Sequence, residues 1–198
     1  MTGWMPDVVP DAPVESAWGN KIRNRSITPF NTLAERDAYI TAPVVGMECY
    51  VIATDSLYYY NGTAWKGRPR GRIAYLPCAT QYNTAAANTW TNTLQITITP
   101  GEPRLCAISA LGAVQQVTAA ANVGLRLLVG VTNLGQFLYA AGVGINSAAF
   151  GFGQFWTTIP AAATSLTLQM WASAQQLRMY PNDATYQSYL AIEDLGTP

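Results

Sequence analysis

The 198-residue chain contains no histidine, which limits the chemistry that its side chains could perform. Histidine is the commonest general base, a usual member of catalytic triads and the commonest metal ligand. Glycoside hydrolysis would instead need two carboxyls that face each other across a bond. Glu193 and Asp194 are neighbours in an expected strand and so point to opposite faces, while Glu102 and Asp183 fall in expected turns. We expect structural or solvated acids and no enzyme, unless carboxyls from different subunits meet at a junction.

The cysteines Cys49, Cys78 and Cys106 are odd in number and about thirty residues apart, which matches no zinc-binding pattern. We expect buried free thiols in strands, because cysteine is among the most buried residue types, and keep a disulfide as the alternative. The segment 142–145 lies between expected strands and lacks a following helix and lysine, so it is interpreted as a turn and not as a phosphate-binding loop. The sequence therefore predicts neither a metal nor a cofactor.

Charge is scarce in the last two thirds of the chain. From Ile73 to Pro198 the formally charged side chains are Glu102, Arg104, Arg126, Arg178, Asp183, Glu193 and Asp194. An ordinary domain of this length would carry about 30 charges. Soluble monomers rely on charge to stay apart, so a surface of Ala, Thr, Gln, Asn and Gly is expected to face other subunits. The composition therefore predicts a component of an assembly.

The charge balance of the whole chain argues against several partners. Net charge is zero and the isoelectric point is about 6.2, whereas nucleic acids and acidic membrane surfaces select for a basic excess. The basic segment 66–72 is interpreted as a solvated linker or an ion-paired joint between domains. No run approaches the roughly 18 apolar residues of a membrane span, and the N-terminus carries acids where a signal peptide would be basic. We expect assembly in a host cytoplasm without membrane insertion.

Residues 1–29 are expected to form an extended arm. They contain four prolines, Pro6, Pro10, Pro13 and Pro29, and show neither helical nor strand periodicity. Large apolar side chains on an irregular segment are costly to leave in water, so the arm is expected to dock on a partner, with a loose terminus as the alternative. The expected anchor residues are Trp4, Met5, Trp18, Ile22, Arg23 and Arg25.

The segment 30–72 is predicted to be a small module with a short helix and a β-hairpin. Thr32 and Glu35 have the spacing of a capping box, so we expect a helix that runs through Tyr39. Asn61-Gly62 is the strongest short-range hairpin signal and predicts positive φ at both residues. The strands of the module are expected at 47–54, 57–60 and 63–65.

Residues 73–198 show an almost continuous period of two, which is typical of strands with one buried face. Turn residues separate these strands at the spacing of a sandwich or barrel. We therefore predict a mainly β protein whose C-terminal domain is an antiparallel β-sandwich of about eight strands, a jelly roll. The expected strands lie at 94–98, 104–110, 125–131, 136–141, 148–158, 166–171, 175–180 and 186–193.

Aromatic residues gather in one expected strand, 148–158. Phe150, Phe152 and Trp156 share one side of it and Phe155 lies on the other, so at least one aromatic row needs cover. We expect the side chains on one side to be buried in the protein core and those on the other side to contact another subunit. The alternative is that both rows are simply part of the core. The expected oligomer interface is Phe150, Phe152, Phe155, Trp156 and Trp171.

Short motifs at both ends resemble parts of known virion proteins. The segments 31–39, 43–47, 51–55 and 57–65 read NTLAERDAY, PVVGM, VIATD and LYYYNGTAW. They resemble a small module of tailed-bacteriophage virion proteins, in which an Asn-Gly-x-x-Trp hairpin precedes a fibre domain. The closing segment 189–196, YLAIEDLG, is similar to the last strand of tail and fibre proteins from phages of actinobacteria. Together the quoted segments hold 36 of the 198 residues.

The resemblance implies a virion structural protein that its arm anchors to the capsid or tail and that displays a homotrimeric knob similar to tumour necrosis factor. The knob would sit at the tail tip, baseplate, tail fibre or head, and would serve assembly, decoration or attachment to host-surface glycans. The alternative is a soluble carbohydrate-binding module or lectin, because sugar rings stack on exposed aromatic side chains. A free lectin would have no use for Trp4 and Trp18 on an irregular leader, which favours the virion protein.

Overall fold

The structure is a computed structural model, and its described part comprises residues 27–84, 86–174, 176–181 and 186–198. The six expected anchor residues of the arm lie outside the described residues: Trp4, Met5, Trp18, Ile22, Arg23 and Arg25. Asp183 also lies outside them. No helix of the described part is long and apolar enough to cross a membrane.

The chain divides into two compact units, the first ending at Gly67 and the second beginning at Arg68. The sequence places this boundary after residue 72. The structure differs because Gly71–Pro77 already forms a strand, β5, that pairs with the last strand of the second unit. The basic segment is therefore not a free linker, and its second half belongs to the C-terminal sandwich.

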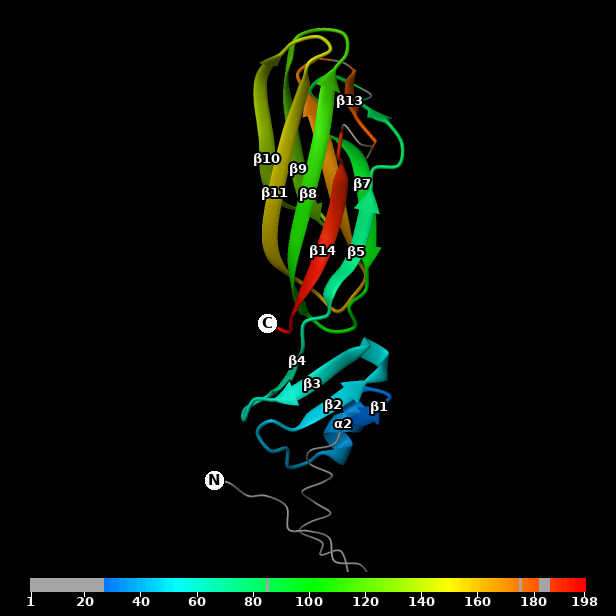
Figure 1. Ribbon diagram of the computed structural model, residues 1–198, viewed down its shortest axis with the longest axis vertical. Helices are drawn as coiled ribbons and strands as arrows, with labels where there is room; N and C mark the ends of the chain where they lie inside the picture. Colours follow the sequence, from blue (N-terminus) through cyan, green and yellow to red (C-terminus); the bar gives the residue numbers. More distant parts are fainter. Residues whose placement is uncertain (1–26, 85, 175, 182–185) are drawn as a thin grey trace, which may run out of the picture. The chain divides into compact units, whose positions relative to one another are not determined.

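The first unit is a small sheet with a short helix. Its elements are β1 (Thr28–Phe30), α2 (Leu33–Tyr39), β2 (Glu48–Val51), the 3-10 turn η1 (Ile52–Thr54), β3 (Ser56–Tyr60) and β4 (Trp65–Gly67). The sheet order is β1-β2-β3-β4, with β1 parallel to β2 and the other pairs antiparallel (Figure 1). Thr32 caps the helix by accepting the Glu35 N–H at 3.1 Å, as its spacing predicts. The end of the expected arm belongs to this unit, because Phe30 of β1 is buried in its core.

The hairpin between β3 and β4 differs in detail from its prediction. Gly62 has a φ of +103°, but Asn61 is not among the residues with positive φ. The loop spans four residues, and the Asn61 side-chain oxygen accepts the N–H groups of Thr63 and Ala64, each at 2.9 Å. Asn61 therefore acts through its side chain, as in an Asx turn, and only Gly62 supplies the left-handed backbone.

The second unit is an antiparallel β-sandwich. Its strands are β5 (Gly71–Pro77), β6 (Tyr82–Asn83), β7 (Thr91–Ile98), β8 (Arg104–Gln116), β9 (Ala121–Val129), β10 (Thr132–Val143), β11 (Ala148–Ile159), β12 (Thr164–Ala172), β13 (Leu177–Met179) and β14 (Tyr189–Gly196). One sheet, here the β8 sheet, has the order β5-β14-β8-β13-β6, with β11 on the other side of β8. The other, the β12 sheet, has the order β10-β9-β12-β7. Figure 1 shows β11, β8, β14 and β5 side by side in one layer.

The strand pairing is nested in the manner of a jelly roll. The first and last long strands pair (β5 with β14), and so do β7 with β12, β8 with β11 and β9 with β10. This is the topology of one long hairpin folded over into two sheets. The predicted fold class, mainly β with a C-terminal jelly roll, is confirmed.

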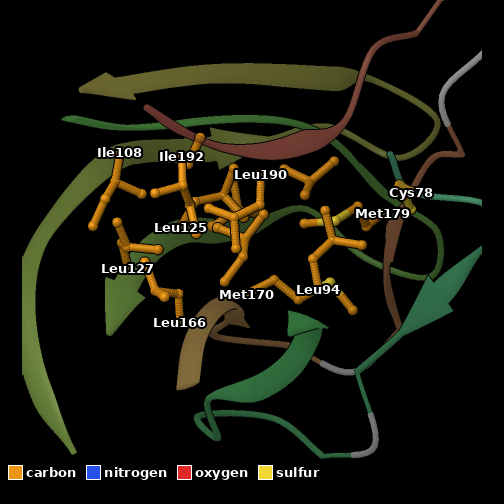
Figure 2. Close-up of a cluster of buried hydrophobic side chains, with 14 of the residues drawn as sticks. Cys78, Leu94, Ile108, Leu125, Leu127, Leu166, Met170, Met179, Leu190 and Ile192 are labelled. Carbon is orange, nitrogen blue, oxygen red and sulfur yellow. The ribbon is translucent and has the colours of Figure 1, made fainter. Parts of the chain in front are cut away.

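The core of the sandwich lies between the two sheets. Alternate residues of the strands point inward, including Leu125 and Leu127 of β9 and Leu166 of β12, none of which is exposed. Figure 2 shows them facing Ile108 of β8 and Ile192 of β14 across the sandwich. The expected strand 125–131 extends too far at its end, because β9 stops at Val129. Val131 is 97% exposed, in the turn before β10.

Candidate functional site

A row of aromatic side chains stands exposed on β11. Phe150 and Phe152 are each 57% exposed and Trp156 is 62% exposed. The intervening Gly151 and Gly153 face inward, where a Cβ atom would lie 2.6 Å from Leu138 and 2.7 Å from Phe137 respectively. Side chains of β10 thus pack directly against the backbone of β11, and the glycines make that approach possible. The alternation of phenylalanine and glycine places the bulk of this strand on its outer face.

The aromatic row continues over the outer face of the β8 sheet. Tyr186 stacks on Phe150 with ring centroids 6.0 Å apart, and Tyr180 stacks on Tyr186 at 4.1 Å. The residues of β8 paired with the row are small or aliphatic: Ala113 opposite Phe150, Leu111 opposite Phe152 and Ala107 opposite Trp156. We call Phe150, Phe152, Trp156 and Tyr186 the β11 patch.

The structure separates the five residues that the sequence assigns to one oligomer interface. Phe155 points inward, lies 6.1 Å from Phe137 between ring centroids and packs on the core, on the opposite side of β11 from the exposed row. Trp171 belongs to β12 and lies on the outer face of the opposite sheet. A period of two assigns a residue to one of two faces, but it cannot say which sheet a strand joins. Phe150, Phe152 and Trp156 remain as one surface.

β11, which carries the β11 patch, and the nearby strand β10 are both edge strands of their sheets. Among the described strands, β11 pairs with β8 alone and β10 pairs with β9 alone. Each spans 12 residues, and neither contains a charged residue or a proline. Monomeric proteins usually protect such edges with charges, prolines or covering segments, because unpaired backbone groups recruit other strands. The side of the sandwich formed by β10 and β11 lacks the first two of these protections.

A second aromatic cluster lies on the outer face of the β12 sheet; the sequence assigned one of its residues, Trp171, to the expected oligomer interface and did not predict the rest as a site. The ring centroids of Trp90 and Trp171 are 6.2 Å apart, and the guanidinium of Arg126 lies 4.2 Å from the Trp90 ring. Arg126 Nε donates to Gln169 Oε1 at 2.7 Å, and Gln169 Nε2 donates to Asn92 Oδ1 at 2.6 Å. We call these five residues the Trp90–Arg126 cluster.

A buried ion cluster joins three segments of the second unit. Arg104 at the start of β8 is fully buried and contacts Asp194 of β14, with Nη2 2.8 Å from Oδ2. Arg104 Nη1 also lies 2.6 Å from Glu102 Oε1, and its Nη2 donates to the Arg68 carbonyl at 2.6 Å. Arg70 Nε donates to Asp194 Oδ2 at 2.6 Å. The cluster therefore ties the entry of the chain into this unit to the start of β8 and to the last strand, β14.

The electrostatics of the cluster fit a structural role. Burial alone would raise the pKa of Asp194, but hydrogen bonds from Arg104, Arg70 and the Gly196 N–H outweigh it and hold that pKa below its ordinary value. Burial would lower the pKa of Arg104, but contacts with Asp194 and Glu102 raise it instead. Neither group is poised to exchange a proton near neutral pH. Glu193 is exposed on the opposite face of β14, so the neighbouring acids point apart as predicted.

The three cysteines are free and buried, as the sequence predicts; Cys49 and Cys106 lie in strands as expected, whereas Cys78 directly follows the end of β5. Burial raises the pKa of Cys49 and of Cys106 to about 11, and it also raises that of Cys78. Thiols of this kind are poor nucleophiles and poor metal ligands at neutral pH. Among the described residues, no group of three or more His, Cys, Asp or Glu side chains could hold a metal ion.

Similarities to known proteins are remote. No protein-family model and no curated protein matches the chain. The VP2 subviral particle of infectious bursal disease virus is similar at 14% identity and a TM-score of 0.41, over 64% of this chain and 33% of that one. The Gt strain of the same virus is similar at 8% identity and a TM-score of 0.35, over 85% and 59%. Eiger TNF from S. frugiperda is similar at 10% identity and a TM-score of 0.38, over 71% and 91%.

This chain thus spans 33% and 59% of those two viral chains. With TM-scores below 0.5, these similarities carry no argument about the function of this chain. The jelly roll of this protein is established by its own nested strand pairing.

Proposed function

We propose that this protein is a structural component of a virus particle, whose jelly-roll unit forms a homotrimer through the β11 patch and the adjoining edges of β10 and β11. The observation that carries the proposal is the exposed row Phe150, Phe152 and Trp156 on an uncharged edge strand. Large exposed aromatic patches of this kind mark interaction sites in soluble proteins. The phage-type module motifs of residues 31–65 support a place on a bacteriophage virion.

The occupant proposed for this surface is a second copy of the chain. A partner recognised by charge would need complementary charges, but the β11 patch contains none. Burying the three exposed aromatic side chains on association would remove about 350 Å² of surface per copy from water, estimated from their exposed fractions and from about 200 Å² for each such side chain. A standard interface buries about 800 Å² per partner. The remainder has to come from the adjoining edges, so a contact in which the edge of one copy meets the face of the next fits best. A threefold rotation between successive copies would close such a contact into a trimeric ring.

The oligomeric state of the full-length chain tests this proposal. Sedimentation equilibrium at about 10 µM should give a trimer. Phe152→Glu and Trp156→Glu should each give a folded monomer, because a buried charge without a partner opposes association. Gln95→Glu, on the exposed outer face of the β12 sheet, is the matched control and should leave the mass unchanged. A wild-type monomer, or variants that associate normally, would refute the interface.

The place on the particle needs a separate test. Deleting residues 1–26 removes the expected anchors and leaves β1 intact, whereas a deletion through residue 29 would also remove most of that strand. The truncated protein should fold and associate but fail to join the particle. Incorporation at the normal level would show that the arm is not the anchor.

A further inference from the structure

We propose that the Trp90–Arg126 cluster binds an acidic saccharide, with a sugar ring on the tryptophans and a carboxylate on the Arg126 guanidinium. The site lies on the opposite sheet from the β11 patch, so it does not depend on the proposed oligomer. Its residues come from β7, β9 and β12 and from Trp90, which immediately precedes β7. β12 lies between β9 and β7 in the sheet, so neighbouring strands supply the whole cluster.

Arg126 is held in position by neutral groups alone. Its Nε is bound by Gln169, which is in turn fixed by Asn92, and one face of the guanidinium lies against the Trp90 ring. No carboxylate among the described residues contacts Arg126. In the ion cluster, by contrast, Arg104 and Arg70 are paired with Asp194. Arg126 thus keeps its terminal N–H donors available, in the planar arrangement that fits a carboxylate.

The tryptophans are positioned by a glycine. Gly124 of β9 lies opposite Trp171 in the strand register, and a Cβ atom there would lie 3.3 Å from Cη2 of Trp90 and 2.9 Å from Nε2 of Gln136. The bare backbone lets the Trp90 ring lie close over the strand. Tyr139 of β10 is paired with the same glycine and is 61% exposed, which extends the aromatic row across the sheet. The half-buried rings of Trp90 and Trp171 thus lie together beside amide and guanidinium groups.

This combination fits a saccharide better than the other classes of ligand. Sugar rings offer an apolar face for stacking and hydroxyls for hydrogen bonds, and the cluster supplies the side-chain amides of Gln169 and Asn92 beside the Arg126 guanidinium. A nucleic acid would need several cations for its phosphates, but the cluster contains one. The unpaired charge of Arg126 selects, within saccharides, those that carry a carboxylate.

The test is isothermal titration calorimetry of the full-length protein with glucuronate-, galacturonate- and sialate-containing oligosaccharides. Each is compared with its carboxyl-reduced form, which keeps the ring but lacks the charge. At least one acidic oligosaccharide should bind, and carboxyl reduction should weaken that binding at least about tenfold. Arg126→Gln should weaken it similarly, and Trp171→Ala should also weaken it, because the ring loses its platform. Binding of the carboxyl-reduced form should be insensitive to Arg126→Gln.

Thr97→Ala, on the same face and outside the cluster, is the matched control and should bind normally. Sedimentation of the same variants keeps the two proposals apart: Arg126→Gln should retain the wild-type mass even if it loses the ligand. The proposal is overturned if none of the oligosaccharides binds at millimolar concentration. It is also overturned if binding survives in both Arg126→Gln and Trp171→Ala, or if the reduced forms bind as well as the acidic ones.

Discussion

Replacing Asp194 with asparagine should be among the most destabilising single changes in the C-terminal unit. In the wild-type protein two guanidiniums, of Arg70 and Arg104, face two carboxylates, of Glu102 and Asp194. The variant leaves two guanidiniums facing one carboxylate, and it turns an acceptor oxygen into a donor directed at Arg104. Removing one partner of a buried pair costs about 3–5 kcal/mol. A domain of this size is stable by only about 5–15 kcal/mol.

The assay is urea unfolding at pH 7, monitored by a spectroscopic signal that reports on the second unit. Asp194→Asn should lose about 3–5 kcal/mol in the free energy of unfolding, or roughly 10–20 °C in the thermal midpoint. Glu193→Gln is the matched control, because the neighbouring side chain is exposed on the opposite face. It should change the free energy of unfolding by less than about 0.5 kcal/mol.

The pH dependence of the same variant has a definite sign. The pKa of Asp194 is lower in the folded protein than its ordinary value, so its charge contributes stability above the unfolded pKa of about 3.9. That contribution is lost as the pH falls through the folded pKa. The gap between wild type and Asp194→Asn should therefore narrow below about pH 4. A loss under about 1 kcal/mol at pH 7, or a gap that stays constant in acid, would refute the reasoning.

The remaining predictions concern the first unit and the thiols. Gly62→Val should lower the free energy of unfolding of the first unit by more than about 1 kcal/mol, because φ is +103° there and a Cβ atom would lie 3.2 Å from Val45. Thermal unfolding of this variant should show an early transition confined to the first unit. A single transition shifted as a whole would contradict two separable units. Cys49, Cys78 and Cys106 should resist a thiol reagent at pH 8 in the native protein and react fully in denaturant; rapid labelling of the native protein would contradict their burial.

The strands of the sandwich were predictable because burial on one face imposes a period of two. The segments at β7, β11 and β12 were each placed within a few residues of their bounds by alternation alone, whereas the expected strand 104–110 ends six residues before β8 does. β5 was missed, since its start lies in a basic stretch rich in glycine and proline that locally indicates a linker. Its strand conformation depends on pairing with β14, more than 100 residues away, and on the contact of Arg70 with Asp194. No local pattern contains that information.

The candidate sites show the same limit. The sequence could group Phe150, Phe152 and Trp156 because they lie on the same face of one strand. Gly151 and Gly153 were the unused signal: paired glycines on one face indicate close packing there and leave the other face to carry the exposed bulk. The Trp90–Arg126 cluster had no such local signal, because it draws single residues from segments that only the sheet order brings together.

The two proposed surfaces reinforce each other through valency. The β11 patch and the Trp90–Arg126 cluster lie on the outer faces of opposite sheets, and none of the five cluster residues belongs to β10 or β11, so we expect association to leave the cluster accessible. A shallow site built on one guanidinium and two indole rings is expected to bind a single sugar weakly. Three copies held together convert the second and third contacts into intramolecular events, which raises avidity by about 10²–10⁴ without any new contact. If both proposals hold, the charge-poor composition that favours association would also determine how strongly a particle bearing this protein holds a carboxylated surface.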